Sequence, residues 1–174
     1  IGDVIHVAQE GLAASFTAGG WLLVNADGGS KDGTQTLAEE SVPGTKDFLQ
    51  ITYPINAVQK ISPEYLGVPG KTSAIKAVCA VASQRNAKVC VVVDSNVRSV
   101  TQDWSGALAR PVVDDGFDFV SCCYLRHKFD GAILNGIVYP FTRALYGKRF
   151  QQPLGGEFAF SAKLVKYFLQ QPQW

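Results

Sequence analysis

The sequence predicts an α/β fold with a mainly parallel sheet and helices on both faces, and three observations predict it. Stretches rich in Val, Leu and Ile alternate along the chain with stretches whose apolar residues recur at helical spacing. The run from Val89 to Val93 is almost all valine, as in a strand buried on both faces of a parallel sheet. Asp94, Ser95 and Asn96 follow it directly, so they are expected at the carboxyl edge of the sheet, where ligands bind in open α/β folds.

The periodicity places the elements in chain order, and capping and breaking residues set their ends. Helices are expected over residues 3–16, 33–40, 70–86, 101–109, 131–146 and 162–170. Strands are expected over residues 21–25, 47–53, 89–93 and 117–124, and a turn with a short strand over residues 155–161. Asp32 and Gln35 can form a capping box for the second helix, Pro111 is expected to end the fourth, and Pro140 to kink the fifth. The proline-rich stretch 54–69 is expected to be a long connection.

The length of 174 residues fits one domain over residues 1–174 with a sizeable core. The net charge of +1 argues against a nucleic-acid partner. No apolar run reaches the roughly 20 residues that a transmembrane helix needs. The cysteines have no metal-site or disulfide spacing and lie in apolar or alanine-rich stretches, which predicts reduced thiols in a cytoplasmic protein: Cys79, Cys90, Cys122 and Cys123.

Four polar residues on this framework suggest a phosphate or cation site. Asp27 and Asp94 both follow strands, so both are expected at the same sheet edge. Asp94 and Asn96 can offer oxygens to one hard cation or one sugar hydroxyl, although Asp, Ser and Asn also form ordinary turns. Lys71 opens a helix, where anions are favoured, but Tyr65 stands where a phosphate-binding P-loop requires glycine.

A second basic cluster follows the strand expected over residues 117–124. Arg126, His127 and Lys128 can bind a carboxylate or phosphate on an acceptor. A solvated loop explains the same three residues without any ligand. Neither histidine has a cysteine or carboxylate at a metal-ligand spacing that would make a site by itself.

Together these stretches resemble nucleotide-sugar glycosyltransferases of the GT-A fold in glycosyltransferase family 2. Residues 27–34, D-G-G-S-K-D-G-T, are similar to that family's D-D-G-S-x-D-G-T turn. Residues 94–96 are similar to its DxD motif, and residues 69–71 to its P-G-K. Residues 124–161, with R-H-K-F-D-G, Y-P-F-T-R-A-L-Y-G-K-R and Q-P-L-G-G-E-F-A-F-S, are similar to the branch around mannosylglycerate synthase and glucosyl-3-phosphoglycerate synthase. The resemblance covers nearly the whole chain.

The resemblance implies a Rossmann-like GT-A nucleotide-diphospho-sugar transferase fold and assigns roles to matching residues. The implied nucleotide-sugar site consists of Asp27, Lys71, Asp94, Ser95, Gly155, Gly156 and Glu157, and the implied acceptor site of Arg126, His127 and Lys128. Asp94 and Asn96 would hold a divalent cation, Mn²⁺ or Mg²⁺. The family usually has Asp where this chain has Asn96, so the loss of one negative charge predicts weaker metal binding.

The function implied by the resemblance is transfer of a sugar from a nucleoside-diphosphate sugar, of GDP-mannose or UDP-glucose type, to a small hydroxyl acceptor such as a glycerate. A catalytically inactive nucleotide-sugar-binding module is the first alternative, and a nucleotidyltransferase is a weaker one. The family pattern is longer at both ends. We therefore expect a chain truncated at both ends, with a missing strand between the strands over residues 21–25 and 89–93 and the catalytic base beyond Trp174. Residues 1–174 alone are expected to bind nucleotide weakly at best and to show no turnover. A homo-oligomer is compatible with the sequence.

Overall fold

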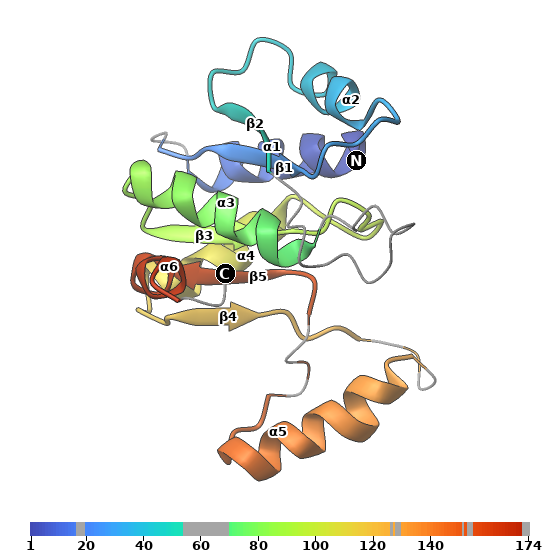
Figure 1. The fold of residues 1–174 in the computed structure, drawn as a ribbon, viewed down its shortest axis with the longest axis vertical. Helices are drawn as coiled ribbons and strands as arrows, with labels where there is room; N and C mark the ends of the chain where they lie inside the picture. Colours follow the sequence, from blue (N-terminus) through green and yellow to red (C-terminus); the bar gives the residue numbers. More distant parts are fainter. Residues whose placement is uncertain are drawn as a thin grey trace, which may run out of the picture.

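The computed structural model describes residues 1–16, 20–53, 70–125, 127, 130–150, 152 and 155–171. Helices and strands alternate along the chain, as the sequence predicts (Figure 1). The helices are α1 (Gly2–Ser15), α2 (Thr34–Glu40), α3 (Lys71–Gln84), α4 (Asp103–Val113), the π-helical η2 (Leu134–Val138), α5 (Tyr139–Tyr146) and α6 (Ala162–Leu169). The strands are β1 (Leu23–Asp27), β2 (Phe48–Thr52), β3 (Val89–Val92), β4 (Phe119–Ser121) and β5 (Phe158–Ser161).

The strands of the described chain form two hydrogen-bonded groups. β1 pairs with β2 in parallel, with Leu23 opposite Phe48. β5 lies between β3 and β4 and is antiparallel to both, so β3 and β4 run in the same direction. No described strand bridges β1 and β3, the place where the sequence predicts a missing strand. The α/β class is confirmed, and β5 is the antiparallel strand in it.

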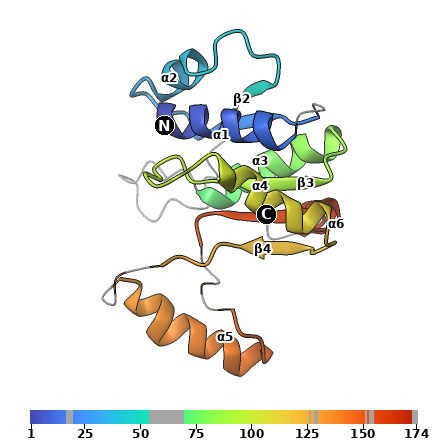
Figure 2. The same cartoon turned by 180° about the vertical axis from the view of Figure 1, so that it is seen from behind.

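Helices cover both faces of the strands. α3 and α6 contact each other on the face seen in Figure 1, and α1 contacts α4 on the face seen in Figure 2. The core under α3 and α6 includes Cys79, Cys90, Phe160 and Val165, all of them buried. Burial raises the pKa of the Cys79 thiol to about 11 and that of Cys90 to about 12, so both are inert apolar side chains.

α4 differs from the sequence prediction because it does not end at Pro111. The helix continues to Val113, with Pro111 inside it. Leu108 and Val112 lie one turn apart and are both buried against β5 at Ala159. A proline inside a helix removes one hydrogen bond, and burial of this apolar stripe offsets that loss.

The fifth predicted helix is present but is built in two parts. Residues 134–138 form the π-helix η2, and α5 continues from Tyr139, with Pro140 in its first turn. Pro140 has no backbone N–H to donate to the preceding turn, so the widened π turn takes the place of the expected kink. Figures 1 and 2 both show α5 set apart from the strands. None of the helices that the structure describes is long and apolar enough to cross a membrane.

Candidate functional site

Lys71 and Asp94 meet at the edge where β3 ends. Lys71 is the first residue of α3, and Asp94 follows β3 by two residues. The Lys71 Nζ donates to Asp94 Oδ1 at 2.6 Å and to the Gly156 carbonyl oxygen at 2.7 Å, and it lies 5.7 Å from the centre of the Phe158 ring. An exposed ion pair of this kind contributes only about 0–1 kcal/mol to folding. The ion pair and the bond to Gly156 hold three chain segments together: the start of α3, the residues after β3 and the residues before β5.

Gly156 and Glu157 reach the same point because β5 is antiparallel. The amino-terminal end of β5 lies beside the carboxyl end of β3, with Phe158 opposite Val92. A Cβ on Gly156 would clash with the Asp94 carboxylate, so only glycine permits this close approach. Glu157 is buried, and burial together with the negative charge of Asp94 raises its pKa despite the opposing effect of Lys71. The result is a compact group of two carboxylates and one ammonium.

Asp27 has a structural role at the end of β1. It is buried, and its carboxylate accepts hydrogen bonds from the Gly29 and Ser30 backbone N–H groups at 3.0 and 2.8 Å, from the Ser30 hydroxyl and from the Gln35 amide. Burial alone would raise the pKa of Asp27, but these hydrogen bonds outweigh it and lower the pKa. Asp27 is therefore the centre of the turn that follows β1.

The predicted capping box at α2 is wrong, because the side chain of Gln35 bonds to Asp27 and not back toward Asp32. Asp32 instead accepts from the Thr34 backbone N–H at 3.1 Å and from the Thr34 hydroxyl. Gly33, with φ of 84°, precedes the helix in the left-handed conformation. Gln35 thus links α2 to the end of β1, a long-range bond that the capping pattern does not predict.

Ser95 and Asn96 lie at the exposed tip of a turn. The Val97 backbone N–H donates to the Asp94 carbonyl at 3.3 Å and closes this turn. Among the described residues, no three His, Cys, Asp or Glu side chains gather as metal ligands. Asp94 and Asn96 still present oxygens from the same turn, which are the donors that Mn²⁺ and Mg²⁺ accept.

The predicted acceptor cluster is only partly described. Arg126 and Lys128 lie outside the described residues. His127 is exposed, and its carbonyl accepts from the Asp130 backbone N–H at 2.8 Å. The role of these three residues remains a prediction.

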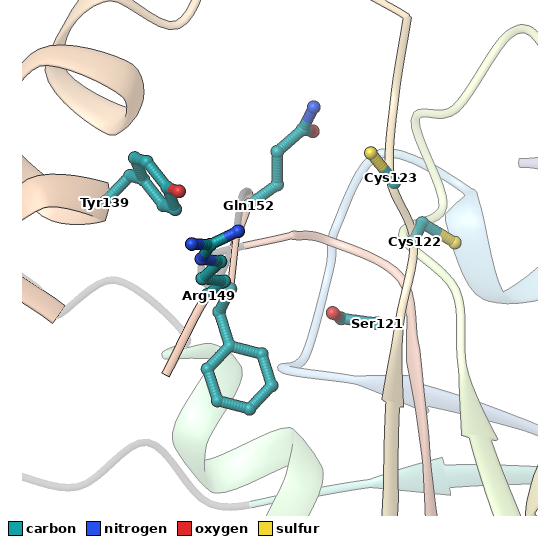
Figure 3. Close-up of a pocket in the computed structure, with 7 residues that line it drawn as sticks. Ser121, Cys122, Cys123, Tyr139, Arg149 and Gln152 are labelled. Atoms are coloured by element: carbon teal, nitrogen blue, oxygen red, sulfur yellow. The ribbon is translucent and has the colours of Figure 1, made fainter. Parts of the chain in front are cut away.

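Sequence reasoning missed a pocket of about 330 Å³ beyond the end of β4 (Figure 3). Its walls come from the end of β4, the start of α5 and the segment after α5: Ser121, Cys122, Cys123, Tyr139, Arg149, Phe150 and Gln152. These segments are distant in the sequence. The sequence signal is the Y-P-F-T-R-A-L-Y-G-K-R stretch, which begins at Tyr139 and ends at Arg149.

The similarity to known proteins lies in solved structures. No protein-family model matches the sequence, and no curated protein matches it. The crystal structure of a mycobacterial protein matches with 25% identity and a TM-score of 0.69, over 94% of this chain and 49% of that one. Glucosyl-3-phosphoglycerate synthase from Mycobacterium tuberculosis, in complex with phosphoglyceric acid, matches with 22% identity and a TM-score of 0.59, over 91% of this chain and 53% of that one.

The same synthase in complex with Mn²⁺, uridine-diphosphate-glucose and phosphoglyceric acid matches with 23% identity and a TM-score of 0.60. That match covers 91% of this chain and 53% of the synthase. The chain spans about half the length of the solved structures that it matches. It therefore has the fold of glucosyl-3-phosphoglycerate synthase, which is the GT-A glycosyltransferase fold that the motifs predict.

Proposed function

We propose that this protein is a metal-assisted glycosyltransferase, which moves a sugar from a nucleoside-diphosphate sugar to a small hydroxyl acceptor. The donor is of UDP-glucose or GDP-mannose type, and the acceptor is a compound such as a glycerate. The observation that carries the proposal is the meeting of Lys71, Asp94 and the Gly156–Glu157 segment at the edge where β3 ends. A structure of the same fold binds Mn²⁺, UDP-glucose and phosphoglyceric acid.

The chemistry of this group suits a diphosphate leaving group. Negative charge develops on the diphosphate as the sugar departs, and a fixed ammonium stabilises that charge. The Lys71 Nζ is fixed by two hydrogen bonds and lies at the start of a 14-residue helix, where the helix dipole also favours an anion. Glu157 lies next to this point, and its carboxyl oxygens can accept hydrogen bonds from sugar hydroxyls.

The oxygen donors present fit a divalent cation. Asp94 and Asn96 would hold it, since they follow β3 in one turn and offer a carboxylate and an amide oxygen. When bound, the cation supplies positive charge to the diphosphate. Lys71 occupies only one of the two Asp94 carboxylate oxygens by hydrogen bonding.

Calorimetric titration with UDP-glucose and GDP-mannose, each with and without Mn²⁺, tests the donor site. Lys71→Ala is expected to weaken binding of the preferred donor by about tenfold or more, because a charge-assisted bond to phosphate is lost. Lys163→Ala is the matched control. Lys163 forms a comparable ion pair with Asp118 at 2.8 Å, before β4 begins and therefore at the opposite edge. Equal losses of donor affinity in the two variants, or no donor binding by the parent protein, would refute the proposed site.

Catalysis is tested separately from binding. Release of UDP or GDP from the bound donor, followed over time with and without glycerate, distinguishes a transferase from a binding module. Acceptor-dependent release supports the proposal. Tight donor binding with no release under any acceptor would leave a nucleotide-sugar-binding module as the function of residues 1–174.

A further inference from the structure

We propose that the helix formed by η2 and α5 docks on an anionic lipid bilayer through its exposed apolar side chains. This docking surface lies outside the proposed donor site and does not depend on the transfer reaction. Four apolar residues, spaced four positions apart, make up the apolar stripe of this helix: Ile133, Ile137, Phe141 and Leu145. Three properties of the helix identify the partner, namely the exposure of the stripe, its direction and the charge around it.

The apolar stripe is exposed along the whole helix. Its four residues are between 59% and 70% exposed. Neither η2 nor α5 has a buried residue, whereas every other helix that the structure describes buries at least one. Single exposed apolar residues are common on protein surfaces, but four in a row along one helix form a continuous patch. A patch of this kind marks an interaction site.

The π turn keeps the apolar stripe on one face of the helix. Residues four apart drift around an α-helix, which has roughly 3.6 residues per turn, and the wider turn of η2 counters that drift. Tyr139 precedes Phe141 by two positions, so the two side chains point about 200° apart. Tyr139 lines the pocket beside β4 (Figure 3). Phe141 and the apolar stripe therefore lie on the side of α5 that faces away from this pocket.

The charge of this segment is entirely positive. The charged residues of the stretch 131–156 are Arg143, Lys148 and Arg149, without any aspartate or glutamate. All three are exposed, and none of them is in an ion pair among the residues that the structure describes. An amphipathic helix with basic side chains suits an anionic bilayer, because the apolar residues enter the interface and the long basic side chains reach the head groups. A second copy of the chain would bring like charges together, which opposes dimerisation through this face.

Co-sedimentation of the 174-residue protein with lipid vesicles tests the proposal. One set of vesicles is phosphatidylcholine alone, and the other is phosphatidylcholine and phosphatidylserine at a ratio of about 7:3. We expect binding to the anionic vesicles at low salt, much weaker binding to the neutral vesicles, and release from the anionic vesicles as sodium chloride is raised.

The apolar contribution is tested with a matched pair of phenylalanines. Phe141→Ser is expected to weaken binding to the anionic vesicles by about tenfold, because it removes an aromatic side chain from the apolar stripe. Phe117→Ser is the control, since Phe117 is 58% exposed against 64% for Phe141 but lies before β4. It should change the vesicle affinity by less than about twofold.

The electrostatic contribution is tested with two double variants that each remove one arginine and one lysine charge. Arg143→Gln with Lys148→Gln is expected to weaken binding to the anionic vesicles by about fivefold or more. Arg85→Gln with Lys88→Gln is the control, because both residues are exposed and lie between α3 and β3. It should leave most of the vesicle affinity intact.

The proposal is overturned if the parent protein binds no vesicles, if it binds both compositions equally well, or if Phe141→Ser binds as the parent does. Sedimentation velocity of the parent and Phe141→Ser is measured alongside. A dimer that Phe141→Ser disrupts, without vesicle binding by the parent, would show that the stripe contacts a second copy and would also overturn the proposal. Far-ultraviolet circular dichroism confirms that each variant is folded, and Leu145→Ser serves as a second variant of the stripe.

Discussion

Gly156 lies so close to Asp94 that a methyl side chain in its place would disturb the proposed donor site. Gly156→Ala is expected to displace the Asp94 carboxylate and so to break its bond with Lys71, because the added Cβ clashes with Asp94. The Asp94 side chain is partly exposed and can move aside, so the unfolding free energy should fall by no more than about 1 kcal/mol. The donor affinity should fall, because Asp94 leaves its position beside Lys71. Urea unfolding and UDP-glucose titration measure the two effects. Gly136→Ala is the control, because its added Cβ has nothing within 4 Å and Gly136 lies outside the proposed donor site. A loss of donor affinity there as large as in Gly156→Ala would contradict this explanation.

Glu157 makes folding stability depend on pH in a defined direction. Its pKa is raised by burial and by Asp94, so the folded protein holds this proton more tightly than the unfolded chain does. Stability therefore falls as the pH rises from the ordinary glutamate range through the raised pKa. Glu157→Gln, which cannot ionise, is expected to be more stable than the parent at neutral pH and equal to it below the ordinary range. Unfolding curves for both proteins across this range measure the difference, and a constant difference at all pH values would exclude Glu157 as its source.

Asn96 is the residue at which this chain departs from the DxD pattern. Asn96→Asp is expected to strengthen Mn²⁺ binding in the presence of UDP, on the order of tenfold, because it adds a carboxylate to the turn that holds Asp94. Asn86→Asp is the control, because it adds the same charge before β3, at the opposite end of the strand. It should leave the Mn²⁺ affinity unchanged. Unchanged affinity in Asn96→Asp would remove this residue from the proposed metal site.

At the scale of elements, two helical glycines are predicted to respond in opposite ways to the same substitution. Gly11 of α1 is buried against the Gln102 backbone at the start of α4, and a Cβ there would clash with it. Gly11→Ala should lower the unfolding free energy by about 1–3 kcal/mol. Gly136 of η2 has nothing within 4 Å of an added Cβ, so Gly136→Ala should raise it by up to about 1 kcal/mol through helix propensity. Urea unfolding compares the two, and a common sign would show that the α1–α4 contact is not as close as described.

The ends of the helices show what local sequence patterns can and cannot predict. α1, α3 and α6 lie within two residues of their predicted bounds, because helical spacing of apolar residues is a property of the segment itself. α4 extends past Pro111 because Leu108 and Val112 pack against Ala159 of β5, a contact with a distant part of the chain. A proline therefore ends a helix only where the burial of neighbouring apolar residues does not offset the lost hydrogen bond.

At the scale of the whole molecule, the interruption between β1 and β3 predicts an uneven pattern of hydrogen exchange. Backbone amides of β1 that donate to β2 should exchange slowly, and those that point away from β2 should exchange faster, since no described strand pairs with that side. β5 is the internal reference, because it is paired on both sides by β3 and β4 and should be protected throughout. Exchange measured by nuclear magnetic resonance tests this, and uniform protection along β1 would mean that its second side is also paired.

The α/β class, the order of the elements and most of the residues of the proposed donor site follow from the sequence by itself. The valine-rich run before Asp94 predicts a buried strand, and the polar residues after it predict an edge with ligand-binding chemistry. Lys71 is predicted at a helix start, where it lies. These features are local, since each depends on residues within a few positions of one another.

Only the tertiary structure decided which segments meet. It places β5 antiparallel between β3 and β4, and this brings Gly156 and Glu157 to Asp94. It also engages Asp27 in the turn after β1 and brings Arg149 and the end of β4 together around one pocket. The physical reason is that pairing between distant segments depends on burial and hydrogen bonding by both of them. A local pattern of residues describes only one of the two segments.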